Sequence, residues 1–154
     1  MQKLSPKFQC FTQEAELPRL PFFKMREHAM DKDLYDAGMK LRREVVGAEY
    51  VDKAMTAADD LTADFQDLVT EYCWGAVWTR EGLSHRDRSL LNLGMLTALG
   101  KPNELKLHLR GALKNGVTRD EIREIFIQTA VYCGVPAALE AFRMAREVFD
   151  EADK

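Results

Sequence analysis

The sequence of 154 residues is poor in the features that mark disulfide-rich, membrane-spanning or metal-binding proteins. Its three cysteines, Cys10, Cys73 and Cys133, lie far apart and form no CxxC pair, so neither a disulfide framework nor a tetrahedral zinc site is expected. No apolar run approaches the roughly 18 residues of a membrane span, and the first residues lack the apolar segment of a secretory signal. We therefore expect no metal, no membrane association and a reducing, cytoplasmic setting.

The chain also has no excess of positive charge. The 22 Lys and Arg residues stand against 25 Asp and Glu residues, which gives a net charge of -3. A nucleic-acid groove or a polybasic membrane patch needs clustered basic residues, so we expect no nucleic-acid partner. The apolar share of 46% and the charged share of 31% are typical of a globular protein.

Strand patterns are missing as well, because no segment alternates apolar and polar residues between hairpin signals. From Asp31 onward the apolar residues recur at helical spacing, which predicts an all-α bundle of about six or seven helices. Helix starts are indicated by capping boxes at 84–87 and 118–121 and by Pro102, and helix ends by Gly47, Gly116 and Gly134.

Residues 1–29 differ from this helical part because Pro6, Pro18 and Pro21 interrupt any helical period. Four phenylalanines make the segment too apolar for a plain linker. We interpret it as an N-terminal arm or extension, either loosely packed or docked on a neighbouring subunit, and residues 30–154 as the folded domain. Met30 begins the helical pattern and is itself a possible start.

The predicted helix from Leu61 to Trp78 carries two stripes. We expect the core face to hold the apolar residues at 61, 65, 68, 69, 72 and 76. A second stripe beside it holds Asp67, Glu71, Trp74 and Trp78. Two tryptophans beside two carboxylates suit the wall of a cleft or an interface, and a solvated edge is the alternative.

The helix from Pro102 to Lys114 places His108 on the same face as Leu105 and Leu109. Such a histidine has two interpretations. It is a core residue satisfied by one hydrogen bond, or it is a catalytic acid or base whose pKa is shifted by burial. Leu107 falls on the opposite face and is expected at the surface, where it could form a subunit contact.

Arginines gather at the predicted start of the helix that follows Ser84. Arg80, Arg86 and Arg88 near the N–H groups of a helix start would suit an anion. A plain solvated surface is the alternative, and His85 is interpreted in that way because a cation is disfavoured in a first helical turn.

Several blocks of the chain together resemble the carboxymuconolactone decarboxylase family: E71-Y-C-W-G75, residues 82–91, residues 104–116 and residues 130–139. The resemblance runs from about Met30 to the C-terminal end. It implies an all-helical fold of the alkylhydroperoxidase D-like type and self-association into a ring, a hexamer or a trimer. It also implies cofactor-independent decarboxylation of 4-carboxymuconolactone, a small lactone dicarboxylate, to 3-oxoadipate enol-lactone in protocatechuate catabolism.

The wider superfamily carries a CxxC motif, then three residues, then a histidine. Aligning that histidine with His108 places the thiol positions at Lys101 and Glu104, so thiol peroxidase chemistry is not expected. The same alignment favours a functional His108.

The resemblance leads us to assign candidate site residues. We expect His108 to donate a proton or to hydrogen-bond the developing oxyanion, with Glu71 as a second acid or base. Arg86 and Arg88 are expected to bind substrate carboxylates, and Trp74 and Tyr132 to form pocket walls. Two alternatives remain: a thiol-dependent redox enzyme, which requires Cys73 and Cys133 to meet, and a non-catalytic helical oligomer or binding protein.

Overall fold

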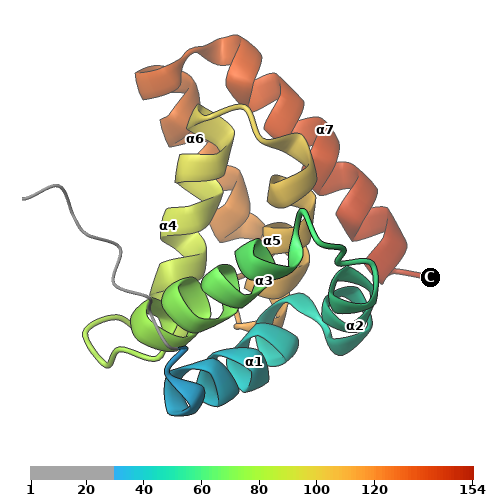
Figure 1. The fold of residues 1–154 in the computed structure, drawn as a ribbon. Helices are drawn as coiled ribbons and strands as arrows, with labels where there is room; N and C mark the ends of the chain where they lie inside the picture. Colours follow the sequence, from blue (N-terminus) through green and yellow to red (C-terminus); the bar gives the residue numbers. More distant parts are fainter. Residues whose placement is uncertain (1–29) are drawn as a thin grey trace, which may run out of the picture.

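The computed structural model describes residues 30–154, and the predicted N-terminal arm, residues 1–29, lies outside the described residues. Within the described part the chain is helical and contains no strand, so the all-α prediction is confirmed. The elements in chain order (Figure 1) are α1 Lys32–Val46, α2 Ala48–Thr56, α3 Ala63–Leu68, η1 Val69–Trp78, α4 His85–Ala98, α5 Pro102–Lys114, α6 Arg119–Cys133 and α7 Val135–Ala152.

The predicted local signals set the helix boundaries. The Ser84 side chain accepts a hydrogen bond from the Asp87 N–H at 3.1 Å, and Thr118 and Glu121 form a reciprocal capping box. Gly134 adopts a φ of 95°, a conformation that favours glycine, where α6 ends and α7 begins. None of the helices in residues 30–154 combines the length and apolar content that a membrane crossing requires.

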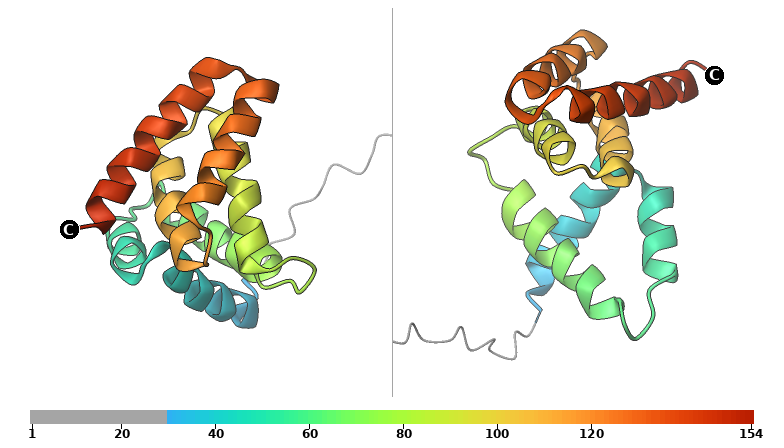
Figure 2. Two further views of the ribbon diagram at one scale, coloured as in Figure 1. Left: turned by 180° about the vertical axis from the view of Figure 1, so that it is seen from behind. Right: turned by 90° about the horizontal axis from the view of Figure 1, so that it is seen from above.

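Two apolar clusters form the core, and α5 contributes to both of them. α1 and η1 pack together on one side, and α4, α6 and α7 lie on the other (Figures 1 and 2). The first cluster joins α4 to α7 through the buried residues Leu93, Leu105, Leu109, Ala112, Val117, Ile122, Phe126, Ala141, Ala145 and Val148. The second joins α1, α2 and η1 through Leu41, Val45, Val46, Val51, Trp74 and Trp78.

The expectation for Leu107 is wrong. Leu107 is half-buried and packs against the second cluster, instead of projecting from the surface. A helix packed on both sides buries two faces, so an apolar residue opposite the main stripe is also covered. Leu107 is therefore a core residue within one chain.

The orientation predicted for the helix from Leu61 to Trp78 is also wrong. Leu61, Phe65, Leu68 and Tyr72 of the expected core stripe are 87%, 60%, 56% and 63% exposed. The buried residues instead come from the other side: Thr70, Glu71, Trp74, Gly75 and Trp78. Glu71, Trp74 and Trp78 were correctly grouped on one stripe by their spacing, so the error lies in which of the two stripes was assigned to the core.

Close backbone contact between α1 and η1 explains which face of η1 is buried. A Cβ atom on Gly38 would overlap the Thr70 carbonyl oxygen, and one on Gly75 would overlap the Leu34 carbonyl oxygen. Only glycine allows this approach. The buried Arg42 adds to the contact by donating to the Thr70 hydroxyl at 2.9 Å and to Gln66 Oε1 at 2.8 Å.

We predict that Gly75→Ala lowers the free energy of unfolding by about 1–3 kcal/mol, because the added methyl group forces α1 and η1 apart. The measurement is a urea denaturation midpoint at a fixed protomer concentration, since self-association would shift the midpoint.

The matched control is Gly94→Ala in the middle of α4, where an added Cβ meets no atom within 4 Å. This variant should be more stable than the parent by about 0.5–1 kcal/mol, the usual helical advantage of alanine over glycine. Equal midpoints for the two variants would contradict the close-contact explanation.

Candidate functional site

The candidate site is built around His108, whose ring lies against two tryptophans of η1. The imidazole is stacked on Trp74 at a centroid distance of 6.3 Å with an interplanar angle of 5°, and on Trp78 at 6.2 Å and 29°. The two indole rings also contact each other, at 4.8 Å. Trp74 and Trp78 are both buried, so at these positions the stripe is not the solvated edge that was considered as the alternative.

Asn92 on α4 provides the polar contact of this ring. Its side-chain Nδ2 lies 3.3 Å from His108 Nδ1. Burial lowers the pKa of His108 below its ordinary value of 6.5, and the nearby Glu104 carboxylate opposes part of that shift. His108 is therefore neutral at pH 7.

Two further residues share the Asn92 side of α4, because they precede it by four and seven residues. His85 lies against Trp78 at a centroid distance of 6.4 Å. Arg88 is half-buried and donates through Nη2 to the Arg80 carbonyl at 2.9 Å. Its Nε is buried and has no hydrogen-bond partner among the described residues, which leaves one N–H available to an anion.

Arg86 lies in a different environment. Its guanidinium is hydrogen-bonded to the Glu121 carboxylate, which links the start of α4 to the start of α6. A substrate carboxylate at Arg86 would have to compete with Glu121. Of the two arginines predicted to bind carboxylates, Arg88 is the one with a buried N–H that has no partner among the described residues.

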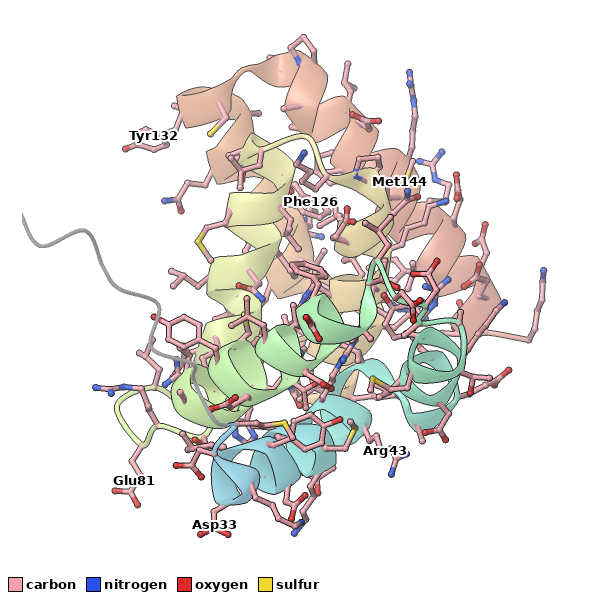
Figure 3. All side chains as sticks on the ribbon, viewed as in Figure 1. Asp33, Arg43, Glu81, Phe126, Tyr132 and Met144 are labelled. Carbon is pink, nitrogen blue, oxygen red and sulfur yellow. The ribbon has the colours of Figure 1, made fainter. Side chains whose placement is uncertain are left out.

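Tyr132 does not belong to the cluster around His108. It is 80% exposed near the end of α6 and points outward from the helix (Figure 3). With Cys133, it lines a hollow between α4 and α6 whose other lining residues include Leu91 and Met95. None of the residues around His108 lines this hollow.

Glu71 is buried on η1 and accepts a hydrogen bond from the Asp31 N–H at 3.0 Å, at the start of α1. A carboxylate at a helix N-terminus satisfies an otherwise unpaired donor and complements the helix dipole. This contact gives Glu71 a structural role, and a role as an acid or base stays a prediction.

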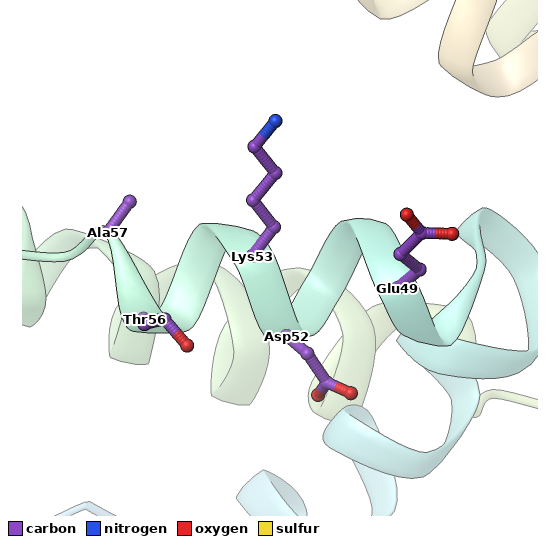
Figure 4. Close-up of a pocket in the computed structure, with 5 residues that line it drawn as sticks. All are labelled: Glu49, Asp52, Lys53, Thr56 and Ala57. Carbon is purple, nitrogen blue, oxygen red and sulfur yellow. The ribbon is translucent and has the colours of Figure 1, made fainter.

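The thiols and acidic groups of the described residues were considered for redox and metal chemistry. Cys73 and Cys133 are free and exposed. Partial desolvation of the Cys73 thiol still raises its pKa, which disfavours the thiolate. Within residues 30–154 no group of three or more His, Cys, Asp or Glu side chains is arranged to hold a metal ion. A second hollow lies on α2 and the residue after it, where Lys53 and Asp52 point in different directions (Figure 4) and no aromatic residue is present.

Sequence reasoning missed two members of the site. Asn92 was not singled out, although it is the one strongly polar side chain in the apolar run from Leu90 to Leu99. His85 was interpreted as a solvated residue because it occupies the first turn of α4. The structure confirms that His85 is exposed, and its ring also lies against Trp78.

Known proteins match most of the chain in sequence. The sequence profile described as the carboxymuconolactone decarboxylase family matches residues 63–147. A 4-carboxymuconolactone decarboxylase of Acinetobacter baylyi is 40% identical over 121 residues, which cover 79% of this chain and 90% of that protein. Nitrosuccinic acid decarboxylase npaB of Metarhizium robertsii is 43% identical over 122 residues, covering 79% and 85% respectively.

The lowered pKa of His108 predicts a dependence of stability on pH. In the folded chain the ring takes up a proton only at a lower pH than in the unfolded chain, where it does so near pH 6.5. Unfolding therefore binds a proton, and the free energy of unfolding falls as the pH drops through and below that value.

The check is urea denaturation of the parent and of His108→Gln at about pH 7.5 and pH 5.5, on either side of the ordinary histidine pKa. The parent should lose more stability on acidification than the variant, since other titrating groups are common to both. An equal loss in the two proteins would show that His108 does not stay neutral on folding.

Proposed function

This chain belongs to the carboxymuconolactone decarboxylase family, and from that premise we propose that it converts 4-carboxymuconolactone to 3-oxoadipate enol-lactone and CO2 without a cofactor. The observation that carries the proposal is a neutral His108 stacked against a pair of tryptophans, with Arg88 and its unpaired Nε–H on the same side of α4 as Asn92, which contacts the ring. The test is CO2 release together with the change in lactone absorbance, using purified protein and that substrate.

The substrate's own structure makes a cofactor unnecessary. The carboxylate to be lost sits on the γ-carbon of a lactone, next to an α,β-double bond. When CO2 leaves, the electron pair is delocalised through that double bond into the lactone carbonyl as a dienolate. Protonation of the α-carbon then gives the enol-lactone. The lactone thus provides the electron sink that other decarboxylases obtain from a bound cofactor.

The protein has to stabilise the charge that develops on the carbonyl oxygen and to hold the second carboxylate. We assign the first task to His108, as a hydrogen-bond donor or proton donor inside a largely apolar wall. We assign the second to Arg88, through its unpaired Nε–H, with Arg86 as a further candidate in exchange with Glu121. Trp74 and Trp78 provide that apolar wall.

A second candidate substrate is a nitro dicarboxylate, because a similarly close relative is named nitrosuccinic acid decarboxylase. Loss of CO2 from a carbon that bears a nitro group leaves a nitronate, whose charge rests on the nitro oxygens. A donor at a developing oxyanion serves that reaction as well. Parallel assays with the lactone and with nitrosuccinate, comparing kcat/KM, decide between them.

We place the reaction in protocatechuate catabolism in the cytoplasm, with the chain self-associated as a hexamer or trimer. The free thiols of Cys73 and Cys133 agree with a reducing setting. The stripe of Leu61, Phe65 and Leu68 supports self-association, because a second copy of the chain could cover it. Tyr132 would then reach a substrate only as part of a surface shared between copies.

We predict that His108→Ala lowers kcat by about 10²–10⁴-fold, the usual contribution of a positioned acid or oxyanion donor. The measurement is steady-state lactone turnover, with circular dichroism to show that the variant is folded. The matched control is Cys73→Ser with Cys133→Ser, which should keep the parent rate. Near-parent turnover in folded His108→Ala would refute the assignment, and thiol-dependent peroxidase activity lost in the double variant would favour the redox alternative.

We also predict that Phe65→Glu dissociates the assembly, because a charge in the centre of the exposed stripe cannot be buried without a partner. Size-exclusion chromatography with light scattering gives the mass, and turnover is followed on the same samples. The control, Glu49→Lys on the polar surface of α2, should keep the parent mass. A fully active monomeric parent would contradict the idea that activity depends on assembly.

A further inference from the structure

We propose that Asn92 is a positioning residue that holds the His108 ring with its single proton on Nε2, so that His108 acts as a neutral hydrogen-bond donor. This inference deepens the proposed function and rests on it. It chooses between the two roles considered for His108, proton donor and oxyanion donor.

The donor and acceptor chemistry of the pair sets the proton's position. The contact joins Asn92 Nδ2 to His108 Nδ1 at 3.3 Å. An amide NH₂ group can only donate, so Nδ1 must offer its lone pair. A neutral imidazole has one proton, which then lies on Nε2. A doubly protonated ring would direct the Nδ1 proton at the amide protons, so Asn92 also disfavours the imidazolium.

The tryptophans fix the plane of the ring but do not determine which of its two edges faces Asn92. Trp74 lies parallel to the imidazole within 5°, and Trp78 within 29°. Stacking alone is nearly unchanged when the ring turns over, although the turn exchanges Nδ1 with a carbon atom. The Asn92 contact from α4 removes this ambiguity, because only one orientation brings Nδ1 to the amide.

The groups around the ring agree with a neutral donor. Asn92 reaches it from α4 and the two indoles from η1, and none of these carries charge. Glu104, one turn earlier on α5, favours the imidazolium, but burial outweighs it. With its single proton on Nε2, His108 stabilises the oxyanion by a hydrogen bond and keeps that proton. The α-carbon takes its proton from solvent, and the hydroxide left behind combines with the released CO2 to give bicarbonate.

The test combines NMR of ¹⁵N-histidine-labelled protein with kinetics. The chain has three histidines, so His108→Gln assigns the ring signals of His108. In the parent we expect an unprotonated Nδ1 and a protonated Nε2. In Asn92→Asp the carboxylate can only accept, which requires Nδ1–H and inverts the pattern. We expect kcat to fall about 10²–10³-fold, as when one oxyanion donor is lost, with KM little changed.

The matched control is Asn103→Asp, which adds the same charge at an exposed position of α5 and should keep the parent spectrum and kcat. Should Asn92→Asp not fold, Asn92→Ala removes the amide and is expected to show both tautomers. A parent ring protonated on Nδ1 would overturn the inference, and so would an inverted pattern in Asn92→Asp with full kcat. A parent with the expected tautomer but no decarboxylation of the lactone or of nitrosuccinate would overturn the proposed function and leave the placement of the proton standing.

Discussion

The contact between the backbones of α1 and η1 at Gly38 and Gly75 is the constraint on which the site depends. With no Cβ at either position, the two helices approach until carbonyl oxygens fill the space that side chains would occupy. This approach fixes the rotation of η1 about its axis. Trp74 and Trp78 consequently turn inward, toward α5, and the apolar stripe from Leu61 turns outward. The same helix contact thus places the indole rings beside His108 and leaves the apolar stripe uncovered.

Helix positions could be predicted because their signals are local. Ser84 and Thr118 cap the helices that follow them, and Gly134 separates two helices, whatever the rest of the chain does. The inward stripe of α7 was also predictable, since Ala138, Ala141, Ala145 and Val148 are buried as the spacing indicates. In each case the short-range pattern and the tertiary structure favour the same arrangement.

The orientation of η1 and the environment of Leu107 could not be predicted in this way. Hydrophobicity marks which residues gain from burial, but it does not say whether the covering surface belongs to the same chain or to another copy. The glycine contact between η1 and α1 outweighs the larger apolar stripe in deciding which face is buried. Asn92 was visible in the sequence as a polar residue within an apolar helix, but its partner is 16 residues away and follows only from the packing of α4 on α5.

The site separates two electrostatic tasks that would interfere if they were combined. Substrate carboxylates need a permanent positive charge, a role that we propose for Arg88 at the start of α4. The reacting oxygen needs a donor that does not bind the carboxylate about to leave, because holding that charge in the ground state would slow its loss. A neutral His108 meets this need, since an imidazolium beside the tryptophans would attract the departing carboxylate itself. The same donor suits a lactone carbonyl or a nitro group, as both place the new charge on oxygen. Discrimination between such substrates must therefore come from the shape of the surrounding walls and from the distance between the donor and Arg88.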